Sequence, residues 1–370
     1  MHQQEHSDRP LKARERHQLR KRSFDAAARL YDKFRPGYPE PLFDDLVQLS
    51  GIPAGGRILE IGPGTGQATL PLARRGLSIL GLELGASMAR VCRRNTHEFP
   101  NVEILNVAFE DWTGDTSATR SSQHSARKTG TVRGKQGLSR AESSRIGDRS
   151  APSPTQALSG PVPASAPQGS DAAAGDTSAT RSSRRSVDVS PPRDCPSFSA
   201  PPGTVPSFPH AAEAFDLVLA ATAFHWIPYK VAYPRCARAL KPSGSLALLW
   251  NFVDIPDTRF YRDLQGIYRS IVPRMHLSAP PELRIERQRK KIVSSGHFGP
   301  VTMLRYPWQK EYDADGYIGL LKTMSDHAIL AANIRREIFR AIRKLIADNG
   351  GSFIRPVIAV LFLAPKRPST

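Results

Sequence analysis

Apolar runs and amphipathic stretches alternate along two parts of the chain. Several short runs are almost continuously apolar, as expected of parallel strands that are covered on both faces. Most of them are followed by a stretch with helical periodicity, a pattern typical of a doubly wound α/β sheet. The predicted strands are 56–61, 77–82, 102–105, 215–220 and 244–250. The predicted helices before and between them are 39–50, 66–75, 86–95 and 230–240.

Residues 252–370 change to a helix-rich pattern, which predicts a C-terminal lobe beside the sheet. Pro356 lies inside the one strand predicted there and cannot donate to a ladder, so a bulge or a frayed start is expected. The predicted elements of this part are helices around 258–272, 280–295, 313–325 and 332–348 and a final strand at 353–364.

Between the two ordered parts, residues 114–212 are rich in Ser, Ala, Pro, Gly and Arg and poor in large apolar residues. Such a composition buries too little surface to offset chain entropy, so a disordered insertion is predicted. It contains one direct repeat, "GDTSATRSS", at Gly114–Ser122 and Gly175–Ser183. With a basic flexible tail at 1–22, the insertion leaves two core segments, 23–113 and 213–251, and the lobe at 252–370.

Composition narrows the classes of function. The formal net charge is +18, but the basic residues are spread along the chain and no recognised nucleic-acid module accompanies them. Nucleic acid is therefore a disfavoured partner, and no membrane span is expected because no apolar run is long enough. The widely spaced cysteines Cys92, Cys195 and Cys236 suit neither a disulfide framework nor a zinc site, so no metal is predicted. Without a secretory signal pattern, the cytoplasm is the default location.

The stretch "LEIGPGTGQATL" (59–70) joins the first predicted strand to a helix. Its glycines, Gly62, Gly64 and Gly66, allow positive φ and close approach of a ligand to the backbone. The spacing departs from the G-x-G-x-x-G of NAD sites, and an acid, Glu60, precedes the loop. The loop thus predicts a nucleotide-type site and disfavours a dinucleotide; a plain tight turn is the alternative.

Glu83 ends the second predicted strand and is placed to accept both hydroxyls of a ribose. A surface glutamate that caps the next helix is the alternative. The exit of the third strand, "AFEDW" (108–112), is where an adenine ring would rest, with Phe109 against the ring and Glu110 or the backbone at its amino group. Phe109 could equally be a core residue.

These motifs resemble those of class I S-adenosylmethionine-dependent methyltransferases. The segments "LEIGPGTGQAT", "LGLELGASM", "AFEDW", "FDLVLAATAFHW" and "ALKPSGSLALLWN" occur in the order of that family. Segments 23–39 and 312–327 are similar to those of the subgroup around trans-aconitate methyltransferase. The resemblance implies a Rossmann-like, seven-stranded sheet whose last strand is antiparallel. It also implies S-adenosyl-L-methionine as cofactor.

The resemblance also implies roles for single residues. Glu60 and the glycine loop would hold the methionine part, Glu83 the ribose, and Phe109 with Glu110 the adenine. Tyr31 and Arg35 would close over the amino-acid end, with the arginine pairing the carboxylate.

The chain departs from the family pattern in two places. The acid common at the adenine site falls near Ala108, and "KPSG" (241–244) replaces a glycine pair. Gly244 is therefore expected to take a positive φ.

His225, in "AFHW" at the exit of the fourth strand, is the candidate catalytic residue. It could position or deprotonate an acceptor, form an aromatic wall with Trp226, or simply pack. Four residues of the C-terminal lobe are weaker candidates for the acceptor pocket, since ordinary structural roles suit each of them: Arg305, Trp308, Tyr317 and His327.

The predicted function is methyl transfer to a small-molecule acceptor by in-line displacement, with a carboxylic acid as one candidate acceptor. Two alternatives stay open: a nucleic-acid or protein methyltransferase that uses the basic insertion as an arm, and a cofactor-binding protein without turnover. The sequence does not specify the acceptor, the methylated atom or the oligomeric state.

Overall fold

The structure is a computed structural model that describes residues 23–113, 212–273, 275 and 279–368. All of these residues fall within one of the two compact units into which the chain divides, Met1–Thr129 with Ala200–Thr370. The predicted tail at 1–22 and insertion at 114–212 lie almost entirely outside the described residues, as does Cys195.

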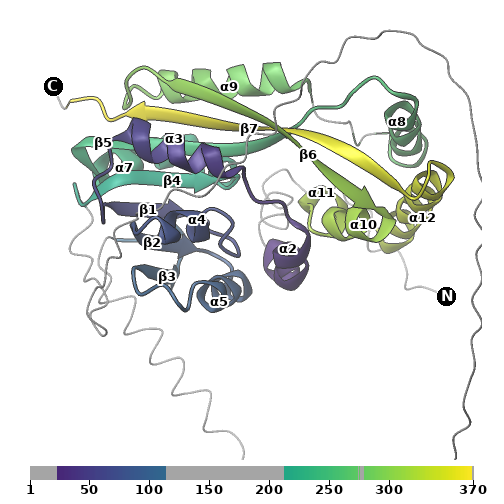
Figure 1. Cartoon of the computed structure of the whole chain (residues 1–370), viewed down its shortest axis with the longest axis horizontal. Coiled ribbons are helices and arrows are strands. Elements are labelled where there is room, and N and C mark those ends of the chain that lie inside the picture. The colour runs from purple at the N-terminus through teal and green to yellow at the C-terminus, as the bar shows by residue number, and fades with distance from the viewer. Residues whose placement is uncertain (1–22, 114–211, 274, 276–278, 369–370) are drawn as a thin grey trace, which may run out of the picture. The chain divides into compact units, whose positions relative to one another are not determined.

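The core of this unit is a seven-stranded sheet with the order β3-β2-β1-β4-β5-β7-β6 (Figure 1). β7 is antiparallel to both of its neighbours, and the other described pairings are parallel, which confirms the predicted topology. The strands are β1 (Arg57–Ile61), β2 (Ser78–Glu83), β3 (Val102–Asn106), β4 (Phe215–Ala221), β5 (Leu240–Val253), β6 (Thr302–Asp313) and β7 (Ser352–Pro365).

Helices cover both faces of the sheet, as the continuous apolar strands predict. On one face, Leu42, Phe43 and Leu46 of α3 (Glu40–Ser50) and Leu72 of α4 (Thr69–Arg74) pack on the sheet in one apolar cluster. On the other face, α7 (Tyr229–Ala239) and α9 (Pro281–Ser294) pack in a second cluster. α5 (Ala86–Asn95) packs beside β3 through Ala89 and Cys92.

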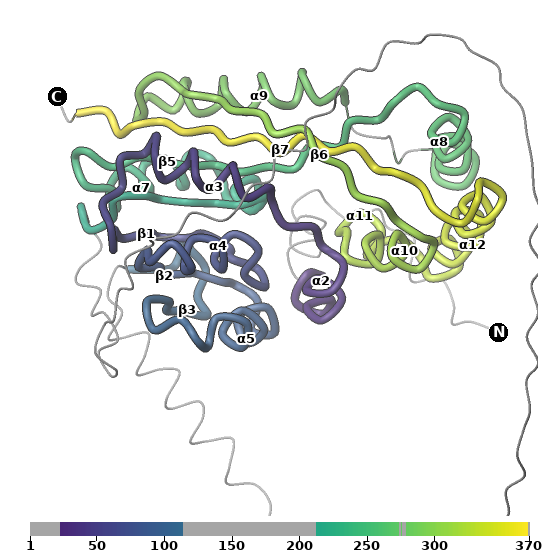
Figure 2. Tube along the Cα trace, viewed as in Figure 1, coloured from purple at the N-terminus to yellow at the C-terminus, as the bar shows by residue number. Residues whose placement is uncertain are grey.

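The C-terminal lobe is built on the far ends of β6 and β7, which run on beyond the rest of the sheet (Figure 2). Its core gathers apolar side chains of three helices around Phe353 of β7. The helices are α8 (Arg259–Ile271), α10 (Ala314–Lys322) and α12 (Ala332–Asp348), with the short α11 (Ser325–Ala328) between the last two. The predicted helical lobe is therefore present.

A helix before the sheet, α2 (Ala28–Phe34), was not predicted from periodicity. It packs against α10 so closely that a Cβ on Gly319 would lie 2.6 Å from the Phe34 ring. The N-terminal segment is thus fixed to the C-terminal lobe, although the two lie almost three hundred residues apart in sequence.

Three further details differ from the sequence predictions. β6 was not located, because Pro307 and its alternation of exposed and half-buried positions give no apolar run. β7 has neither the bulge nor the frayed start expected at Pro356, since its register with β6 is continuous from Ser352 to Leu363. Pro356 lies just past the last residue paired with β5. Its carbonyl accepts from the Asp254 N–H, and the reciprocal bond that the proline cannot donate falls at the very end of that ladder.

The expectation for Gly244 is also wrong, because its φ is not among the positive values in the structure. A Cβ at this position would lie 2.9 Å from Leu240 and 3.0 Å from the Phe215 carbonyl. Close packing within the start of β5, rather than a left-handed backbone, therefore requires the glycine.

Candidate cofactor and methyl-transfer site

The glycine loop leaves β1 and turns beneath the exit of β4. Gly62 and Gly64 have φ values of 66° and 63°, and Gly66 has 103°, as predicted. A Cβ on Gly62 would lie 2.7 Å from the Ala223 Cβ, so a side chain is excluded there by both the backbone and its neighbour. The bare backbone brings the carboxyl ends of β1 and β4 together. A ligand can therefore reach main-chain atoms of the loop at this edge of the sheet.

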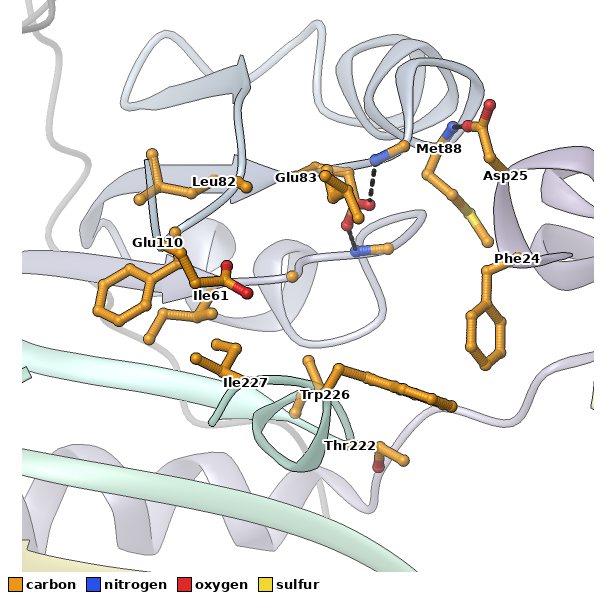
Figure 3. A pocket seen from close by; sticks show the side chains of 18 of the residues that line it. Phe24, Asp25, Ile61, Leu82, Glu83, Met88, Glu110, Thr222, Trp226 and Ile227 are labelled. Atoms are coloured by element: carbon orange, nitrogen blue, oxygen red, sulfur yellow. Dashed lines mark hydrogen bonds between the residues drawn. The ribbon is translucent and has the colours of Figure 1, made fainter. Parts of the chain in front are cut away.

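Glu83, at the end of β2, is held by the backbone on either side of it. Its Oε2 accepts from the Gly64 N–H at 3.0 Å, and its Oε1 accepts from the Gly85 N–H at 2.8 Å. The residue is 9% exposed and lines a pocket (Figure 3). The loop fixes the orientation of this acid before any ligand arrives.

Glu60 does not line that pocket, although the next residue, Ile61, does. It is fully buried, and its Oε2 accepts from the Thr69 hydroxyl at 2.7 Å. Burial raises the pKa of Glu60 to about 7, the Thr69 hydrogen bond opposes this, and the charge of Glu83 adds to it. Its Oε1 has no hydrogen-bond partner among the described residues. A buried oxygen without a donor is costly and calls for a functional explanation.

The pocket has an empty volume of about 760 Å³, including solvent at its open side. The exits of β1 to β4 form one wall, and the N-terminal segment forms the other. Of the predicted site residues, it brings together Tyr31, Gly62, Gly64, Glu83, Phe109 and Glu110, and it leaves out Arg35, Glu60, Gly66 and His225. Sequence reasoning did not single out most of the rest of the lining: Phe24, Asp25, Ile61, Leu82, Leu84, Gly85, Met88, Ala108, Ala221, Thr222, Ala223 and Ile227.

The N-terminal segment is attached to the sheet by Asp25. Its Oδ1 accepts from the Ser87 and Met88 N–H groups at 2.6 and 3.1 Å, which caps the start of α5. The Phe24 ring meets the Trp226 ring edge-on at 5.4 Å, so the two sides of the pocket touch through aromatic side chains (Figure 3). No local sequence pattern marks Asp25 as a cap of α5, because its partners lie about sixty residues away and only the tertiary structure brings them together.

Thr222 is the one non-glycine pocket residue with a positive φ, 54°, among those described. Its hydroxyl bonds to the Tyr38 hydroxyl at 2.7 Å, and its N–H donates to Leu249 at 2.8 Å. Burial raises the pKa of Tyr38, so this phenol stays neutral. A threonine in this conformation costs about 1–3 kcal/mol, and such strain concentrates at functional sites.

Arg35 does not take the place predicted for it. Its Nε donates to the Thr323 hydroxyl at 2.9 Å, and its Nη2 donates to the Thr323 carbonyl at 3.0 Å, at the end of α10. The guanidinium stacks over the Tyr31 ring, 5.0 Å from its centroid. In this structure Arg35 therefore joins α2 to the C-terminal lobe and supports Tyr31 from behind.

His225 and Trp226 lie on a short 3₁₀ turn, η1 (Phe224–Trp226), at the exit of β4. Trp226 lines the pocket, whereas His225 is exposed beside it with ring centroids 4.7 Å apart. Of the three possibilities for this pair, the aromatic wall describes Trp226. His225 is adjacent to that wall rather than part of it.

The four candidates in the C-terminal lobe lie outside the pocket lining. Arg305 forms a two-point ion pair with Glu282 of α9 at 2.6 Å. Trp308 donates to Asn251 at 3.3 Å, and Tyr317 packs edge-on against Phe353 at 4.9 Å. His327 is buried, and its Nε2 is 2.8 Å from the Tyr268 hydroxyl.

Neither metal nor membrane features occur in the part of the chain that the structure describes. No group of three or more His, Cys, Asp or Glu side chains is arranged to hold a metal ion there. No described helix combines the length and apolar character needed to cross a bilayer.

The comparisons with known proteins agree with the glycine loop, the acid after β2 and the strand order. A family model for a methyltransferase domain matches residues 59–121 and 176–248, and 59–113 and 212–248 of these are described. The match and the fold support a class I S-adenosylmethionine-dependent methyltransferase, whose cofactor is S-adenosyl-L-methionine.

Two curated relatives share part of this chain. An uncharacterised methyltransferase of Mycobacterium tuberculosis is 33% identical over 147 residues, which are 40% of this chain and 55% of that protein. An uncharacterised methyltransferase-like protein of Schizosaccharomyces pombe is 35% identical over 80 residues, 21% of this chain and 31% of that protein. The chain thus matches about half or less of the length of these relatives.

Two solved structures are similar at lower identity. The phosphoethanolamine N-methyltransferase 2 of Haemonchus contortus, in complex with phosphomonomethylethanolamine and S-adenosylhomocysteine, has a TM-score of 0.42 at 14% identity. That match covers 96% of this chain and 60% of the other. The YcgJ protein of Bacillus subtilis has a TM-score of 0.41 at 12% identity, covering 90% and 100%.

Proposed function

We propose that the protein transfers a methyl group from S-adenosyl-L-methionine to a small-molecule acceptor. The observation that carries this proposal is Glu83, which the N–H groups of Gly64 and Gly85 hold in a fixed orientation at the pocket wall. Two vicinal hydroxyls need such an acceptor, and a preoriented carboxylate binds them without paying to order itself.

The pocket residues fit the rest of the cofactor. Ile61, Leu82, Phe109 and Ile227 give an apolar lining suited to an adenine ring, and Glu110 lies beside it for the amino group. Phe109 is held from behind by Arg235, whose guanidinium lies 5.6 Å from the ring centroid. When bound, the cofactor supplies an electrophilic methyl group on a sulfonium. The chain's task is to position the acceptor and exclude water.

Glu60 and the glycine loop remain the proposed contacts of the methionine part. The unpaired Oε1 of Glu60 supports this role, because a donor from an amino group or a bridging water would satisfy it. Gly66 supports it only indirectly, since its Cβ position faces Cys92 and Leu70 rather than the pocket. Tyr31 would close over this end of the cofactor, and Arg35 would act through Tyr31 instead of pairing a carboxylate itself.

The acceptor would enter between Trp226, Thr222 and the N-terminal segment, which complete the lining opposite the glycine loop. We keep a carboxylic acid as the proposed acceptor class, and with it the resemblance to trans-aconitate methyltransferases. A carboxylate is already ionised near pH 7 and needs no general base. His225 is then proposed to contact the acceptor from its exposed place beside Trp226, not to remove a proton from it.

Calorimetry with S-adenosylmethionine and S-adenosylhomocysteine tests the cofactor site. We expect Glu83→Ala to lower the affinity for both at least a hundredfold, because both hydroxyl acceptors and the anchor of the loop are lost. Glu98→Ala, on an exposed side chain, is the control and should bind as the wild type does. Unchanged affinity in Glu83→Ala would refute the ribose assignment.

A methyl-release assay on carboxylic acids and phenols then tests the activity. Turnover of a carboxylic acid supports the proposal. Cofactor binding without turnover of any acceptor would instead indicate a binding protein. Methylation of RNA, DNA or protein that is lost on deletion of 114–212 would indicate the macromolecular alternative.

A further inference from the structure

Three aromatic side chains gather on one side of the cofactor pocket. Phe24 and Tyr31 belong to the N-terminal segment, and Trp226 lies on η1 at the exit of β4. The Phe24 ring meets the Tyr31 ring edge-on, with centroids 6.2 Å apart. It meets the Trp226 ring in the same way at 5.4 Å (Figure 3). These three residues, here called the aromatic corner, come from two segments about two hundred residues apart in the sequence.

The aromatic corner borders both ends of the glycine loop. A Cβ on Gly62 would lie 2.7 Å from Ala223, the residue that directly precedes η1. A Cβ on Gly64 would lie 3.4 Å from the Tyr31 ring. The loop and the aromatic corner therefore bound the same part of the pocket, since both belong to its lining.

The charged side chains in the pocket lining are all acidic. Asp25, Glu83 and Glu110 contribute carboxylates, and no lysine, arginine or histidine is among the described residues that line the pocket. The chain as a whole has a formal net charge of +18, so the lining departs from the overall composition. Carboxylates in a partly buried site attract a cation more strongly than they do in water, because the local dielectric constant is lower. The pocket is therefore suited to a ligand that carries a positive charge.

Packing accounts for only part of the aromatic corner. Phe24 and Tyr31 pack on one side against a small apolar cluster that contains Met88. All three rings of the corner nevertheless stay half-buried, whereas Phe43, an aromatic residue of the core, is fully buried. Aromatic rings attract cations through their faces. Aromatic surface that lines an acidic pocket is therefore better explained by a bound cation than by packing alone.

The three rings are not equivalent as partners of a cation. The Arg35 guanidinium lies 5.0 Å from the Tyr31 centroid and is held there by two hydrogen bonds to Thr323. The Tyr31 ring thus already has one cation against it. Tryptophan binds cations best among the aromatic side chains. We therefore expect Trp226 to contribute most to the binding of a cationic ligand and Tyr31 to contribute least.

We propose that the aromatic corner binds the sulfonium group of S-adenosylmethionine and selects this charged cofactor over the neutral S-adenosylhomocysteine. The inference rests on the proposed function, because it takes Glu83 as the ribose contact and the glycine loop as the contact of the methionine part. The sulfonium joins these two parts chemically, so the rings that border the loop are the side chains available to it. Glu83 and the loop bind groups that both nucleosides share, and only the aromatic corner responds to the difference in charge.

Selection by charge acts on binding and release. Methyl transfer breaks the S–CH3 bond, leaves both bonding electrons on sulfur and gives a neutral thioether. The product therefore loses its attraction to the aromatic corner and leaves more readily. Because the positive charge on sulfur declines in the transition state, this contact does not accelerate the chemical step. A bound sulfonium also offsets part of the negative charge of the lining, so an anionic acceptor is expected to bind after the cofactor.

Calorimetry with S-adenosylmethionine, S-adenosylhomocysteine and sinefungin tests the selection. Sinefungin has an ammonium-bearing carbon in place of the methylated sulfur, so it is a stable cationic probe. We expect the wild type to bind both cations at least tenfold more tightly than S-adenosylhomocysteine. Trp226→Leu and Phe24→Leu should each reduce this ratio of affinities at least threefold. Trp226→Phe keeps an aromatic ring and should retain most of the ratio.

Leu84→Ala is the matched control, because Leu84 lines the same pocket with an aliphatic side chain. This variant should weaken the binding of all three ligands alike and leave the ratio within twofold of the wild type. The ratio is measured on one protein, so partial unfolding of a variant lowers both affinities equally and does not change it.

Two results would overturn the proposal while leaving the proposed function in place. One is equally tight binding of all three ligands by the wild type. The other is an unchanged ratio in both leucine variants, which would show that the carboxylates select the cation without the rings. Failure of the wild type to bind any of the three nucleosides would refute the proposed function, and the inference with it.

Discussion

The cofactor crevice and the C-terminal lobe satisfy their polar groups in different ways. In the crevice, backbone N–H groups hold Glu83, and Asp25 caps α5. Glu60 Oε1 is the exception among the described acids there. In the lobe, the Tyr312 hydroxyl and the Nδ1 of His327 are buried without a hydrogen-bond partner among the described residues. The crevice is preorganised by its own backbone, whereas the lobe keeps capacity for groups that the chain does not supply.

This difference fits separate roles for the two regions, with the cofactor bound in the crevice and the acceptor beside the lobe. A cofactor common to many methyltransferases can be bound by glycine backbone and a single acid. An acceptor needs a surface of its own, and here that surface would adjoin the helices packed on the long ends of β6 and β7. Arg35 connects the two, because it bonds to Thr323 of the lobe and stacks on Tyr31 of the pocket.

The largest expected effect concerns the backbone of the crevice. Gly62→Ala combines a left-handed backbone with a Cβ only 2.7 Å from Ala223, so we expect both a large loss of stability and loss of S-adenosylhomocysteine binding. Gly76→Ala is the matched control, because it has a similar φ of 78° and no neighbour within 4 Å. The control should lose about 1 kcal/mol in urea unfolding, the cost of the backbone alone. Equal losses in the two variants would show that the close approach to Ala223 is unimportant.

An intermediate effect is expected from His327 in the lobe. Burial lowers its pKa to about 4 from an ordinary value of 6.5. Its folded-state pKa is depressed, so the folded state binds fewer protons than the unfolded state between these values. The associated stability is complete above pH 6.5 and is lost as the pH falls towards 4. The slope would be at most about 1.4 kcal/mol per pH unit.

Urea unfolding at several pH values, comparing the wild type with His327→Gln, measures this contribution. Glutamine can still bond to Tyr268 but does not titrate in this range, so the variant should lose part of the wild-type pH dependence. His97→Gln, on an exposed side chain, should keep it. If His327→Gln has the same slope as the wild type, His327 is not buried in the neutral form and the lobe is more open than the structure indicates.

The smallest effect is expected at Thr222, a residue of the crevice whose backbone is strained by its positive φ. Thr222→Gly relieves a positive φ, worth about 1 kcal/mol, but it also removes the hydroxyl bonded to Tyr38. We therefore compare it in a Tyr38→Phe background, which lacks that bond, and there we expect Thr222→Gly to stabilise the fold by about 1 kcal/mol in urea unfolding. A double variant that is no more stable than Tyr38→Phe would contradict the assignment of strain.

The strands β1 to β4 were predictable because each is a short, mostly buried apolar run. β1, β2 and β4 begin and end within one residue of the predicted bounds. β6 was not predicted because it is an edge strand that alternates exposed and half-buried positions and contains Pro307, which an edge strand tolerates. α2 was not predicted because it contacts mainly α10 and α5 and buries only one residue, Ala28, so its sequence has no clear apolar periodicity.

Among site residues, Glu83 and the glycines were predictable because their roles depend on a local turn at a strand end. Arg35 was not, since its partner Thr323 lies 288 residues away. Asp25 was missed for the same reason, and its carboxylate caps a helix that begins at Ala86. Sequence spacing therefore located the pocket-lining edge of the sheet but not the segment that covers it.

The sequence by itself determined the alternation of strands and helices, the glycine loop and the acid that follows β2, because each depends on interactions within a few consecutive residues. The tertiary structure alone decided which side chains share a pocket. Phe24 and Trp226 are about two hundred residues apart along the chain, and only the fold brings their rings into contact. Burial and pairing are properties of contacts between distant segments, so they follow from the fold and not from any local pattern.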